Sequence, residues 1–551
     1  MSDLKQNAPE IDALRQGMDW DETDILRKQI LIDSTFGDSH PGSAHLDRLV
    51  QMAADGVKYS GAKPSVFTVT DMCDGIAQGH DGMNYSLVSR DIIAGMVEIH
   101  AKANDFDGLV AISSCDKSVP AHLMAIARLN LPSVFVPGGV MPAAAGGFTL
   151  EQIGNVSVKC RQGDMTKEAF HKCQQDACPS CGACQFMGTA ATMQVLSEAL
   201  GLALPHSALM PVGLKFIQNA AKAAGRACVR LVEQNIRARD ILTERAMKNA
   251  IVIHGAIGGS TNALLHLPAI AHELGIDLDM RLFDELHRKT PFLVNTRPVG
   301  EFSTEMFWYA GGVPRVMLAV KDLLELDALT VTGKTLGENL AEIEGELVRW
   351  EGYLANYGLK REDVIKKLSD TGAIAVLYGN LAEDGAVLKY TALPKEMQVF
   401  CGPARVFDGE LSARNAIIEK KINPGDCIVI RYAGPKGSGM PEMFYTTEAL
   451  CADETLVSTT AIITDGRFSG ASRGPCIGHI SPEAAQGGNL ALIKDGDMIS
   501  IDVPNRRIEA IGVDFESRRK GFSYAPPKES GILGIYKKNA VSAMKGGYMD
   551  V

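Results

Sequence analysis

Two segments of the sequence place an aspartate directly after a cysteine. One is MCDG, with Cys73 and Asp74, and the other is SSCDK, with Cys115, Asp116 and Lys117. Thiolates bind iron or zinc, whereas carboxylate oxygens favour Mg²⁺ or Mn²⁺. Either segment alone could equally be a reactive cysteine beside a salt-bridged pair. Two such pairs in one chain predict a metal cluster lying beside a hard cation.

The segment CPSCGAC places Cys178, Cys181 and Cys184 three residues apart, just before a helical stretch that begins near Met187. The dipole of a helix stabilises thiolates at its N-terminus, which suits them to metal ligation. The spacing alone fits an iron–sulfur cluster and a zinc site equally well. No second CxxC or HxxxH pair follows in the sequence to complete a four-ligand zinc site, and this favours the cluster.

Two glycine-rich segments in the second half of the chain carry further candidates. GPKGSGMPEM (434–443) contains Glu442, and TDGRFSGASRG (464–474) contains Ser469 just after an apolar strand. A serine on a tight turn beyond a strand can act as a nucleophile or base, but no GxSxG elbow surrounds this one. The residues alone therefore favour an ordinary turn serine. The segment GAIGGS (255–260) lacks the spacing of a dinucleotide fingerprint, although its backbone could bind an anion.

The expected strands deliver the two Cys–Asp pairs to one place. A β-branched run from Val66 predicts a buried strand that leads to Cys73, and residues 108–114 predict a strand that ends at Cys115. A third strand is expected at 133–141, with helices at 88–105 and 118–129. This alternation predicts a parallel sheet covered by helices on both faces. In such sheets functional groups gather where the strands end.

The rest of the chain divides by composition. Residues 1–60 are mostly polar with a helical pattern, and helices dominate from about 187 to 370. After about residue 375, short strands alternate with turns rich in Gly, Pro and Asp. The sequence therefore predicts an α/β protein with two domains. Residues 1–372 form an N-terminal α/β domain with a parallel sheet and flanking helices, and residues 373–551 form a smaller, β-rich, barrel-like C-terminal domain.

Composition narrows the class of protein. A chain of 551 residues exceeds one ordinary hydrophobic core, and no apolar run approaches the roughly 18 residues that span a bilayer. The polar N-terminus has no signal-peptide core, so a cytoplasmic protein is expected. The net charge of −11 argues against a nucleic-acid partner. Twelve cysteines in a reducing compartment are expected to be metal ligands, catalytic groups or packed thiols rather than disulfides.

Motifs spread along the chain resemble those of the dihydroxy-acid and phosphogluconate dehydratases. The resemblance runs from about residue 25 to 545. It is carried by MCDGIAQGHDGMNYSLVSRD, SSCDKSVPAHLMA, CQFMGTAATM, GGSTNALLHLPAIA, LTVTGKTLGEN, GPARVF, GPKGSGMPEM, ITDGRFSG and GHISPEAAQGG. It implies an N-terminal α/β domain that holds an iron–sulfur cluster, a barrel-like C-terminal domain that closes the site, and a homodimer or homotetramer.

The resemblance implies that Cys115 and Cys184 bind the cluster. Family members with a [2Fe–2S] cluster take a third cysteine from a Pro-Cys-Asn motif, but here Gly42 of DSHPGSAHL stands in its place. The phosphogluconate dehydratases also lack that cysteine, hold a [4Fe–4S] cluster and keep the cysteine of MCDG. We therefore expect a [4Fe–4S] cluster bound by Cys73 and the two shared cysteines, with [2Fe–2S] as the alternative and Cys181 as the reserve third ligand.

The resemblance also implies a site for Mg²⁺ or Mn²⁺. Its ligands match Asp74, Asp116, Lys117 and Glu442 of this chain. The lysine is carbamylated in family members and binds the metal through its carbamate. Ser469 matches the serine proposed as general base, a role that depends on nearby cations because serine is a poor base at its free pKa. The implied reaction removes water from a small hydroxy acid to give a 2-keto acid.

Three substrate classes are compatible with the family. CQFMGTAATMQVLSEALGLALPHSAL resembles the sugar-acid (aldonate) dehydratases, which places a 2-keto-3-deoxy sugar acid first as the product. GPKGSGMPEM and DVPNRR resemble the dihydroxy-acid dehydratase of branched-chain amino-acid biosynthesis, the second alternative, and phosphogluconate dehydratase comes third. A different class is an iron–sulfur redox sensor. The set of hard-metal ligands argues against a sensor, which has no need of Mg²⁺ beside its cluster.

Overall fold

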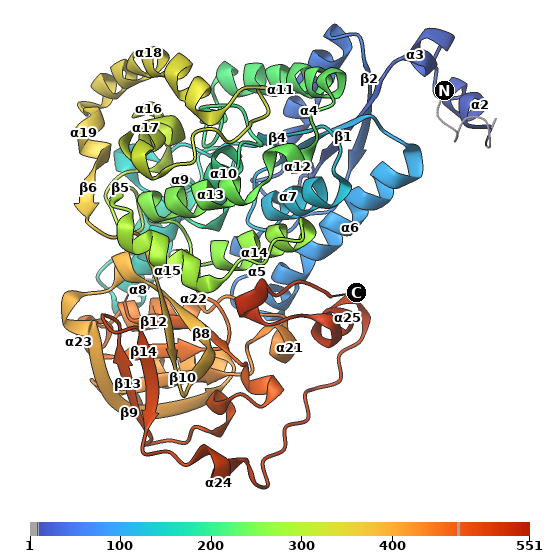
Figure 1. Ribbon diagram of the computed structural model, residues 1–551. Coiled ribbons are helices and arrows are strands. Elements are labelled where there is room, and N and C mark those ends of the chain that lie inside the picture. Colours follow the sequence, from blue (N-terminus) through green and yellow to red (C-terminus); the bar gives the residue numbers. More distant parts are fainter. Residues whose placement is uncertain (1–7, 9, 471–473, 551) are drawn as a thin grey trace.

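The computed structural model describes residues 8, 10–470 and 474–550. The N-terminal part contains a four-stranded parallel sheet in the order β2-β1-β3-β4 (Figure 1). Its strands are β1 (Gln29–Ser34), β2 (Lys63–Thr68), β3 (Gly108–Ser113) and β4 (Ser133–Pro137). The predicted α/β class with a parallel sheet is therefore confirmed.

Two details of this sheet differ from the sequence expectation. Strand β1 lies within residues 1–60, which we expected to be mostly helical, and all six of its residues are buried between β2 and β3. Strand β2, expected to be buried, is instead an edge strand and is only partly covered; Val66 is 50% exposed. Both corrections have one cause: β1, and not β2, takes the central position, so β2 has a hydrogen-bonded neighbour on one side only.

Helices cover both faces of the sheet. Helices α4 (Leu46–Tyr59) and α11 (Lys215–Gln234) pack together on one face, close enough that a β-carbon on Gly56 would lie 2.1 Å from the carbonyl oxygen of Lys222. On the other face, α6 (Ser86–Asn104) and α7 (Ser118–Leu129) each direct a histidine at Asp33 of β1. His100 Nδ1 and His122 Nε2 lie 3.0 and 3.3 Å from its carboxylate.

A helical region continues this core toward the barrel (Figure 1). Its helices are α10 (Thr189–Ala199), α12 (Ala238–Ile241), α13 (Glu244–Ile257), α14 (Ala263–Glu273), α15 (Met280–Lys289), α16 (Thr304–Tyr309), α17 (Gly312–Ala319), α18 (Leu336–Leu354) and α19 (Arg361–Val364). A short antiparallel pair, β5 (Phe292–Val294) with β6 (Ile365–Ser369), connects this region to the C-terminal part. The helix-rich stretch expected between 187 and 370 is confirmed.

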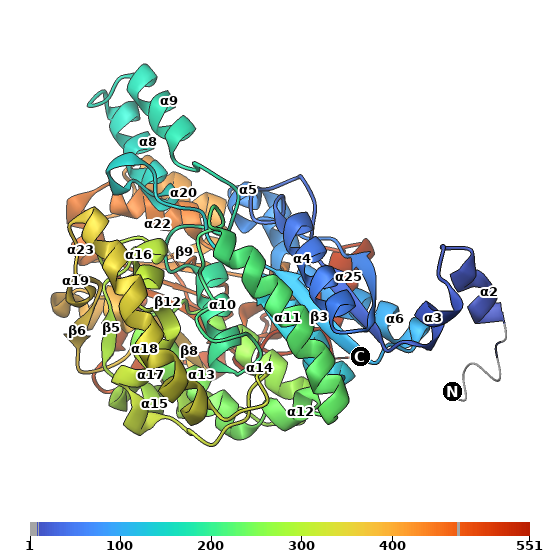
Figure 2. The ribbon, with the colours of Figure 1, turned by 90° about the horizontal axis from the view of Figure 1, so that it is seen from above.

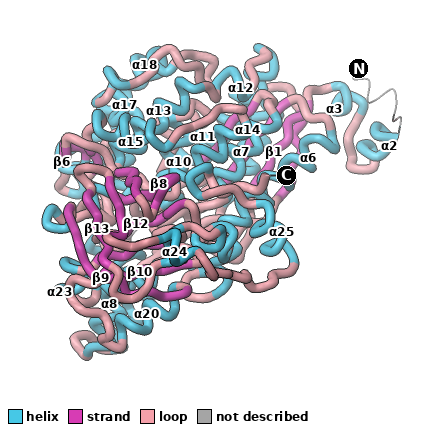
Figure 3. Tube along the Cα trace, turned by 60° about the horizontal axis from the view of Figure 1, so that its bottom comes forward, coloured by secondary structure: helices cyan, strands magenta, loops and turns pink. Residues whose placement is uncertain are grey.

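The C-terminal part is a closed barrel in the order β10-β11-β12-β8-β7-β14-β13-β9, whose strands form the magenta group around the labels β8 to β13 in the lower left of Figure 3. Its strands are β7 (Ile374–Gly379), β8 (Ala382–Lys389), β9 (Val399–Asp408), β10 (Cys427–Arg431), β11 (Ala461–Thr464), β12 (Cys476–Ser481), β13 (Met498–Asp502) and β14 (Arg507–Ile511). The interior is filled by apolar side chains such as Leu377, Val429 and Ile463. The predicted barrel-like C-terminal domain is confirmed.

The two parts interlock at several points. Helix α25 (Gly531–Asn539), near the end of the chain, packs Leu533 and Tyr536 against Leu87 of α6. The hairpin of α8 (Ile153–Gln162) and α9 (Lys167–Asp176) projects from the body beside α20 (Glu410–Ile418) and α22 (Phe444–Cys451) in Figure 2. Because elements of each part pack against the other part, the domain boundary between residues 372 and 373 stays a prediction. None of the described helices combines the length and hydropathy needed to cross a membrane.

Candidate active site

Three cysteines meet at one edge of the N-terminal sheet. Cys73 and Cys115 follow β2 and β3, whose carboxyl ends point to the same edge because the sheet is parallel. Cys184 reaches that edge through its neighbour Ala183, which pairs with Val140 in the segment that follows β4. The backbone N–H of Met141 donates to the Ala183 carbonyl at 2.9 Å and fixes this pairing. The sheet therefore gathers cysteines that lie far apart in the sequence.

A cavity of about 490 Å³ opens at this edge. Its wall includes most of the residues that the sequence singled out: Cys73, Asp74, Cys115, Asp116, Cys184, Glu442 and Ser469. Lys117 is fully buried beside Asp74 and is not part of the wall. Cys178 also lines the cavity, whereas the reserve ligand Cys181 is not among the described lining residues. The structure thus brings the candidates from both domains to one cavity.

Burial sets the protonation of the three thiols. It raises the pKa of Cys73 to about 11, and it raises the pKa of Cys115 and of Cys184 well above the ordinary thiol value. Neighbouring carboxylates and thiols add to the shift of each. Every one of these causes disfavours a bare thiolate. The thiols can become thiolates only when a bound metal supplies the compensating positive charge.

Three carboxylates converge beside the cysteines. One oxygen each of Asp74, Asp116 and Glu442 lies within 4.8 Å of the others. Lys117 Nζ donates to Asp74 Oδ2 at 2.8 Å and lies 4.0 Å from Asp116 Oδ2. Burial opposes the ionisation of Asp74, but Lys117 and Arg467 outweigh it and hold the pKa of this carboxyl below its ordinary value. Burial and the Asp74 carboxylate raise the pKa of Asp116 to about 7.

Glu442 comes from the C-terminal part and is held by residues of the N-terminal part. It follows the short helix α21 (Pro435–Ser438). Asn262 Nδ2 donates to Glu442 Oε1 at 2.6 Å, and Gln78 Nε2 donates to Oε2 at 3.3 Å. Asn262 belongs to the glycine-rich segment GAIGGSTN, to which the sequence assigned no definite role. This segment positions a carboxylate of the cavity.

Arg467 is a site residue to which sequence reasoning gave no role. Its guanidinium is fully buried and donates to Asp74 Oδ2 at 3.3 Å, to Ser86 Oγ at 2.9 Å and, through Nε, to the Met440 carbonyl at 2.7 Å. It also forms an ion pair with Glu442. Arg467 thereby ties a carboxylate of the N-terminal part to one of the C-terminal part. The available signal was its place in TDGRFSG, two residues before the candidate serine.

Arg467→Gln is expected to destabilise the metal-free protein by about 3–5 kcal/mol, because it leaves two buried carboxylates without their guanidinium partner. Mg²⁺ should recover part of this loss, since a bound cation supplies positive charge to the same oxygens. Denaturant unfolding in EDTA and in excess Mg²⁺ measures both effects. Arg245→Gln, which removes an exposed ion pair with Asp327, is the control and should change stability by less than about 1 kcal/mol. An equal loss of stability with and without Mg²⁺ would argue against a cation site at the two carboxylates that Arg467 contacts.

Ser469 lies on the cavity wall on a closely packed loop. A β-carbon on the next residue, Gly470, would lie 2.8 Å from the Cα of Gly188, the residue that precedes α10. Lys389 Nζ donates to the Gly470 carbonyl at 3.3 Å. These contacts hold the serine loop against the start of α10, a few residues after Cys184. Residues 471–473 of the same motif lie outside the described residues.

The donor atoms fit the two groups that the family resemblance implies. Three cysteines on one cavity wall, Cys115 buried and Cys73 and Cys184 half-buried, match the soft ligand set of an iron–sulfur cluster with an open iron position. The three carboxylates offer the oxygen ligands that Mg²⁺ prefers, and they lie next to the thiols. The geometry therefore places the candidate thiol ligands and the candidate carboxylate ligands in one cavity, while their binding of a cluster and a hard cation stays a prediction.

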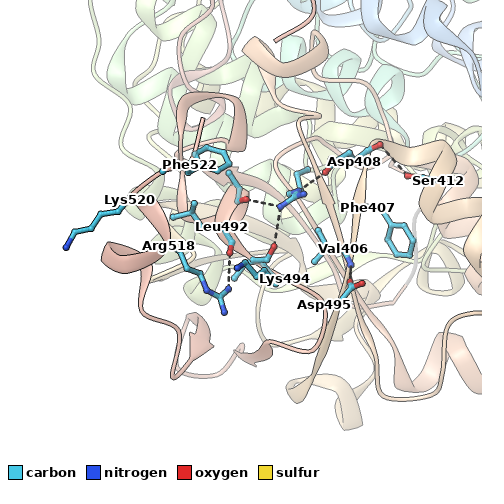
Figure 4. A pocket seen from close by; sticks show the side chains of 14 residues that line it. Val406, Phe407, Asp408, Ser412, Leu492, Lys494, Asp495, Arg518, Lys520 and Phe522 are labelled. Carbon is cyan, nitrogen blue, oxygen red and sulfur yellow. Dashed lines mark hydrogen bonds and ion pairs between the residues drawn. The ribbon is translucent and has the colours of Figure 1, made fainter. Parts of the chain in front are cut away.

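A larger cavity of about 730 Å³ lies on the barrel, but both of its arginines are already paired (Figure 4). Arg431 donates to Asp408 at 2.7 Å and to the Ala491 carbonyl at 2.8 Å. Arg518 forms an ion pair with Asp497, and its Nη2 donates to that carboxylate at 2.8 Å. The described lining of this cavity includes no cysteine. It offers neither ligands for a cluster nor an unpaired arginine for an anion.

Comparisons with known proteins agree with this site. Residues 27–339 match the dihydroxy-acid/6-phosphogluconate dehydratase N-terminal family, and residues 362–547 match its C-terminal counterpart. A dihydroxy-acid dehydratase of Halothermothrix orenii is 43% identical over 544 residues, 96% of each chain. Those of Caldicellulosiruptor saccharolyticus (42% over 551 residues, 98% of this chain and 97% of the relative) and Methanosarcina barkeri (41% over 542 residues, 96% of each) are similar too. The chain therefore belongs to the dihydroxy-acid/6-phosphogluconate dehydratase family and is a hydro-lyase.

Proposed function

We propose that this enzyme dehydrates a 2,3-dihydroxy acid with a short branched carbon chain to the corresponding 2-oxo acid. The relatives reported above are named dihydroxy-acid dehydratases and cover nearly the whole chain at 41–43% identity. They favour the second of the substrate classes considered from the sequence. The sugar acid, which sequence analysis placed first, rested on local resemblance around Cys184 and is not supported by these relatives.

The wall of the cavity supports the branched-chain substrate. Beside the cysteines and carboxylates it presents a set of apolar side chains: Met141, Leu150, Ile153, Phe170, Phe186 and Phe444. Such a surface buries methyl groups favourably, by about 0.8 kcal/mol per carbon. The additional hydroxyls of a sugar acid would each need a hydrogen-bond partner to be buried there.

A phosphorylated substrate fits this cavity least well. Arg161 is the only lysine or arginine among the described lining residues. Glu448 lies close enough to Arg161 to feel its charge. Burial raises the pKa of Glu448 to about 7, and the Arg161 charge acts against this rise. Glu151 also lines the cavity. A phosphate group of charge near −2 would therefore find one shared cation and two acidic side chains, so phosphogluconate remains the third choice.

We propose two resident groups for the cavity. A [4Fe–4S] cluster is held by Cys73, Cys115 and Cys184, since Gly42 offers no thiol for the [2Fe–2S] alternative. Mg²⁺ is held by Asp74, Asp116, Glu442 and a carbamylated Lys117. When bound, the cluster iron and Mg²⁺ act as Lewis acids toward the leaving hydroxyl and the substrate carboxylate.

Residues of the chain remove the substrate proton and position the metal ligands. Ionised Ser469 takes the C2 proton as the C3–O bond breaks, and the departing hydroxide takes that proton from the serine and leaves as water; the resulting enol tautomerises to the 2-oxo acid. A serine hydroxyl is a weak base, so it needs positive charge nearby to favour its ionised form. Arg467 and Asn262 hold Glu442 in place. The apolar wall limits the access of bulk water to the reacting carbons.

The substrate assignment is tested with protein reconstituted without oxygen, with iron and sulfide, in the presence of Mg²⁺. Formation of 2-oxo acid is measured with 2,3-dihydroxyisovalerate, with several aldonates and with 6-phosphogluconate. We expect kcat/KM to be highest for the branched acid, by about 100-fold, because the apolar wall discriminates through methyl burial and unpaired hydroxyls. A higher kcat/KM for an aldonate would overturn the proposed substrate and restore the sugar-acid alternative.

Removal of the hard metal separates an enzyme from a redox sensor. EDTA should abolish formation of 2-oxo acid while the absorbance of the cluster remains, and added Mg²⁺ should restore the activity. This follows because the carboxylate set and the cysteine set bind different metals. Retention of full activity in EDTA would argue against the Mg²⁺ site formed by Asp74, Asp116 and Glu442.

A further inference from the structure

A histidine lies against the sulfur of Cys115. His40 Nδ1 is 3.7 Å from Cys115 Sγ, within hydrogen-bond distance for sulfur. Both residues are buried; His40 is 5% and Cys115 is 7% exposed. Ligating atoms of His40, Cys115 and Asp71 lie within 4.8 Å of one another. None of the roles assigned above involves His40 or Asp71.

Gly42 makes this contact possible. A β-carbon on Gly42 would lie 2.1 Å from Cys115 Sγ and 3.3 Å from His40 Nδ1. No side chain can therefore stand at position 42 while Cys115 and His40 keep this arrangement. Position 42 is the one at which the chain lacks a third cysteine. The imidazole of His40 thus approaches Cys115 in a space that a side chain at position 42 would enter.

The histidine ring is held from its other side. Ser43 Oγ lies 2.9 Å from His40 Nε2, and Asp71 Oδ2 lies 3.9 Å from the same nitrogen. The turn that carries the ring is fixed as well, because the backbone N–H of Ser43 donates to the His40 carbonyl at 3.2 Å. A thiolate can only accept a hydrogen bond, so Nδ1 must carry the proton toward Cys115. In a neutral ring Nε2 then accepts from the Ser43 hydroxyl at 2.9 Å, the shorter of the two contacts open to that proton, since Asp71 Oδ2 lies 3.4 Å from the same Oγ.

We propose that His40 is a positioning residue of the cluster, whose Nδ1–H donates a hydrogen bond to the Cys115 thiolate and raises the reduction potential of the cluster. Hydrogen bonds to the sulfurs of a cluster stabilise its more negative, reduced form. A partner behind the ring fixes its orientation, as carboxylates and hydroxyls do behind metal-bound histidines. The inference rests on the cluster of the proposed function and adds a role that the dehydration itself does not need.

The test is a redox titration of reconstituted protein, followed by electron paramagnetic resonance. His40→Leu removes the donor and should move the midpoint potential to a more negative value. His40→Asn keeps an N–H close to the position of Nδ1 and should restore much of the wild-type potential. Ser43→Ala releases the far side of the ring and should give a smaller shift in the same direction. His171→Leu, which changes an exposed histidine of α9, is the control and should leave the potential unchanged.

Each other outcome counts against the hydrogen bond. An unchanged potential in His40→Leu overturns it, and so does an equal shift in His40→Leu and His40→Asn, which would indicate a purely structural role. Loss of the cluster in His40→Leu would mean that His40 is itself a ligand. If His40→Leu does not fold, an unchanged potential in Ser43→Phe, which displaces the ring, rejects the proposal. Wild-type protein that binds no cluster would instead refute the proposed cofactor.

Discussion

Cys115→Ser is expected to give a colourless protein that holds no iron–sulfur cluster and forms 2-oxo acid only at the background rate. Cys115 lies at the end of the β3 strand, and both Cys73 and Cys184 are near enough to contribute to the rise in its pKa. It is also the most deeply buried of the three thiols. A buried serine hydroxyl is a much poorer ligand for iron than a thiolate. Visible absorbance, iron content and the rate of 2-oxo acid formation measure the effect.

Two further cysteine variants make this result specific. Cys228→Ser changes a fully buried thiol of α11 that bonds to the Leu109 carbonyl, outside the cavity, and should retain both cluster and activity. Cys181→Ser should also retain them, whereas Cys73→Ser should lose the cluster, because only Cys73 of these two lines the cavity. Loss of the cluster in Cys181→Ser, together with its retention in Cys73→Ser, would instead make Cys181 the third ligand.

The strand ends of the active site could be predicted because their signals are local. The apolar run GLVAIS is followed at once by Ser114 and Cys115, and the structure has a buried strand at Gly108–Ser113. A pattern of this kind depends only on neighbours in the sequence. The central strand β1 was missed because QILIDS is a short apolar run within a polar segment, and its place between β2 and β3 depends on contacts with distant residues. The same contacts decide that β2 is an edge strand.

The supporting residues of the site could not be predicted in this way. Arg467 contacts Ser86 across 381 positions, and Asn262 contacts Glu442 across 180. Neither arginine nor asparagine carries a periodic or spacing signal that would reveal such a partner. The contact between His40 and Cys115 also depends on the absence of a side chain at Gly42, which the sequence shows only as a missing ligand. Long-range polar contacts of this kind require the folded structure.

Substrate class illustrates a further limit of sequence reasoning. The stretch that follows Cys184 forms α10, and its residues are buried in the core of the protein. Its resemblance to the sugar-acid dehydratases therefore reflects packing of the protein core as much as recognition of the substrate. The side chains that face the cavity come from several segments: the start of this stretch supplies Phe186 and Thr189, and others come from the α8 and α9 hairpin and from Phe444 of α22. Only their assembly reveals a wall that is largely apolar.

Ser469→Ala is expected to lower kcat by about 10³-fold while the cluster absorbance and Mg²⁺ binding stay at their wild-type values. The change removes one oxygen from the cavity wall and leaves every proposed metal ligand in place. Exchange of the substrate C2 proton with solvent should stop as well, because no other hydroxyl is assigned to remove it. Turnover, cluster absorbance and deuterium incorporation at C2 in D₂O measure the three effects separately.

A second serine of the same cavity gives the matched comparison. Ser157 on α8 also lines the wall, and its hydroxyl accepts a hydrogen bond from Arg161 at 3.3 Å. Ser157→Ala should change kcat by only a few-fold, because this serine belongs to the projecting hairpin and not to the loop that follows Arg467. If Ser469→Ala kept full activity, the base would have to be another group of the cavity. Loss of the cluster in Ser469→Ala would instead show that the serine loop supports the thiols, and the assignment of proton removal to Ser469 would lose its basis.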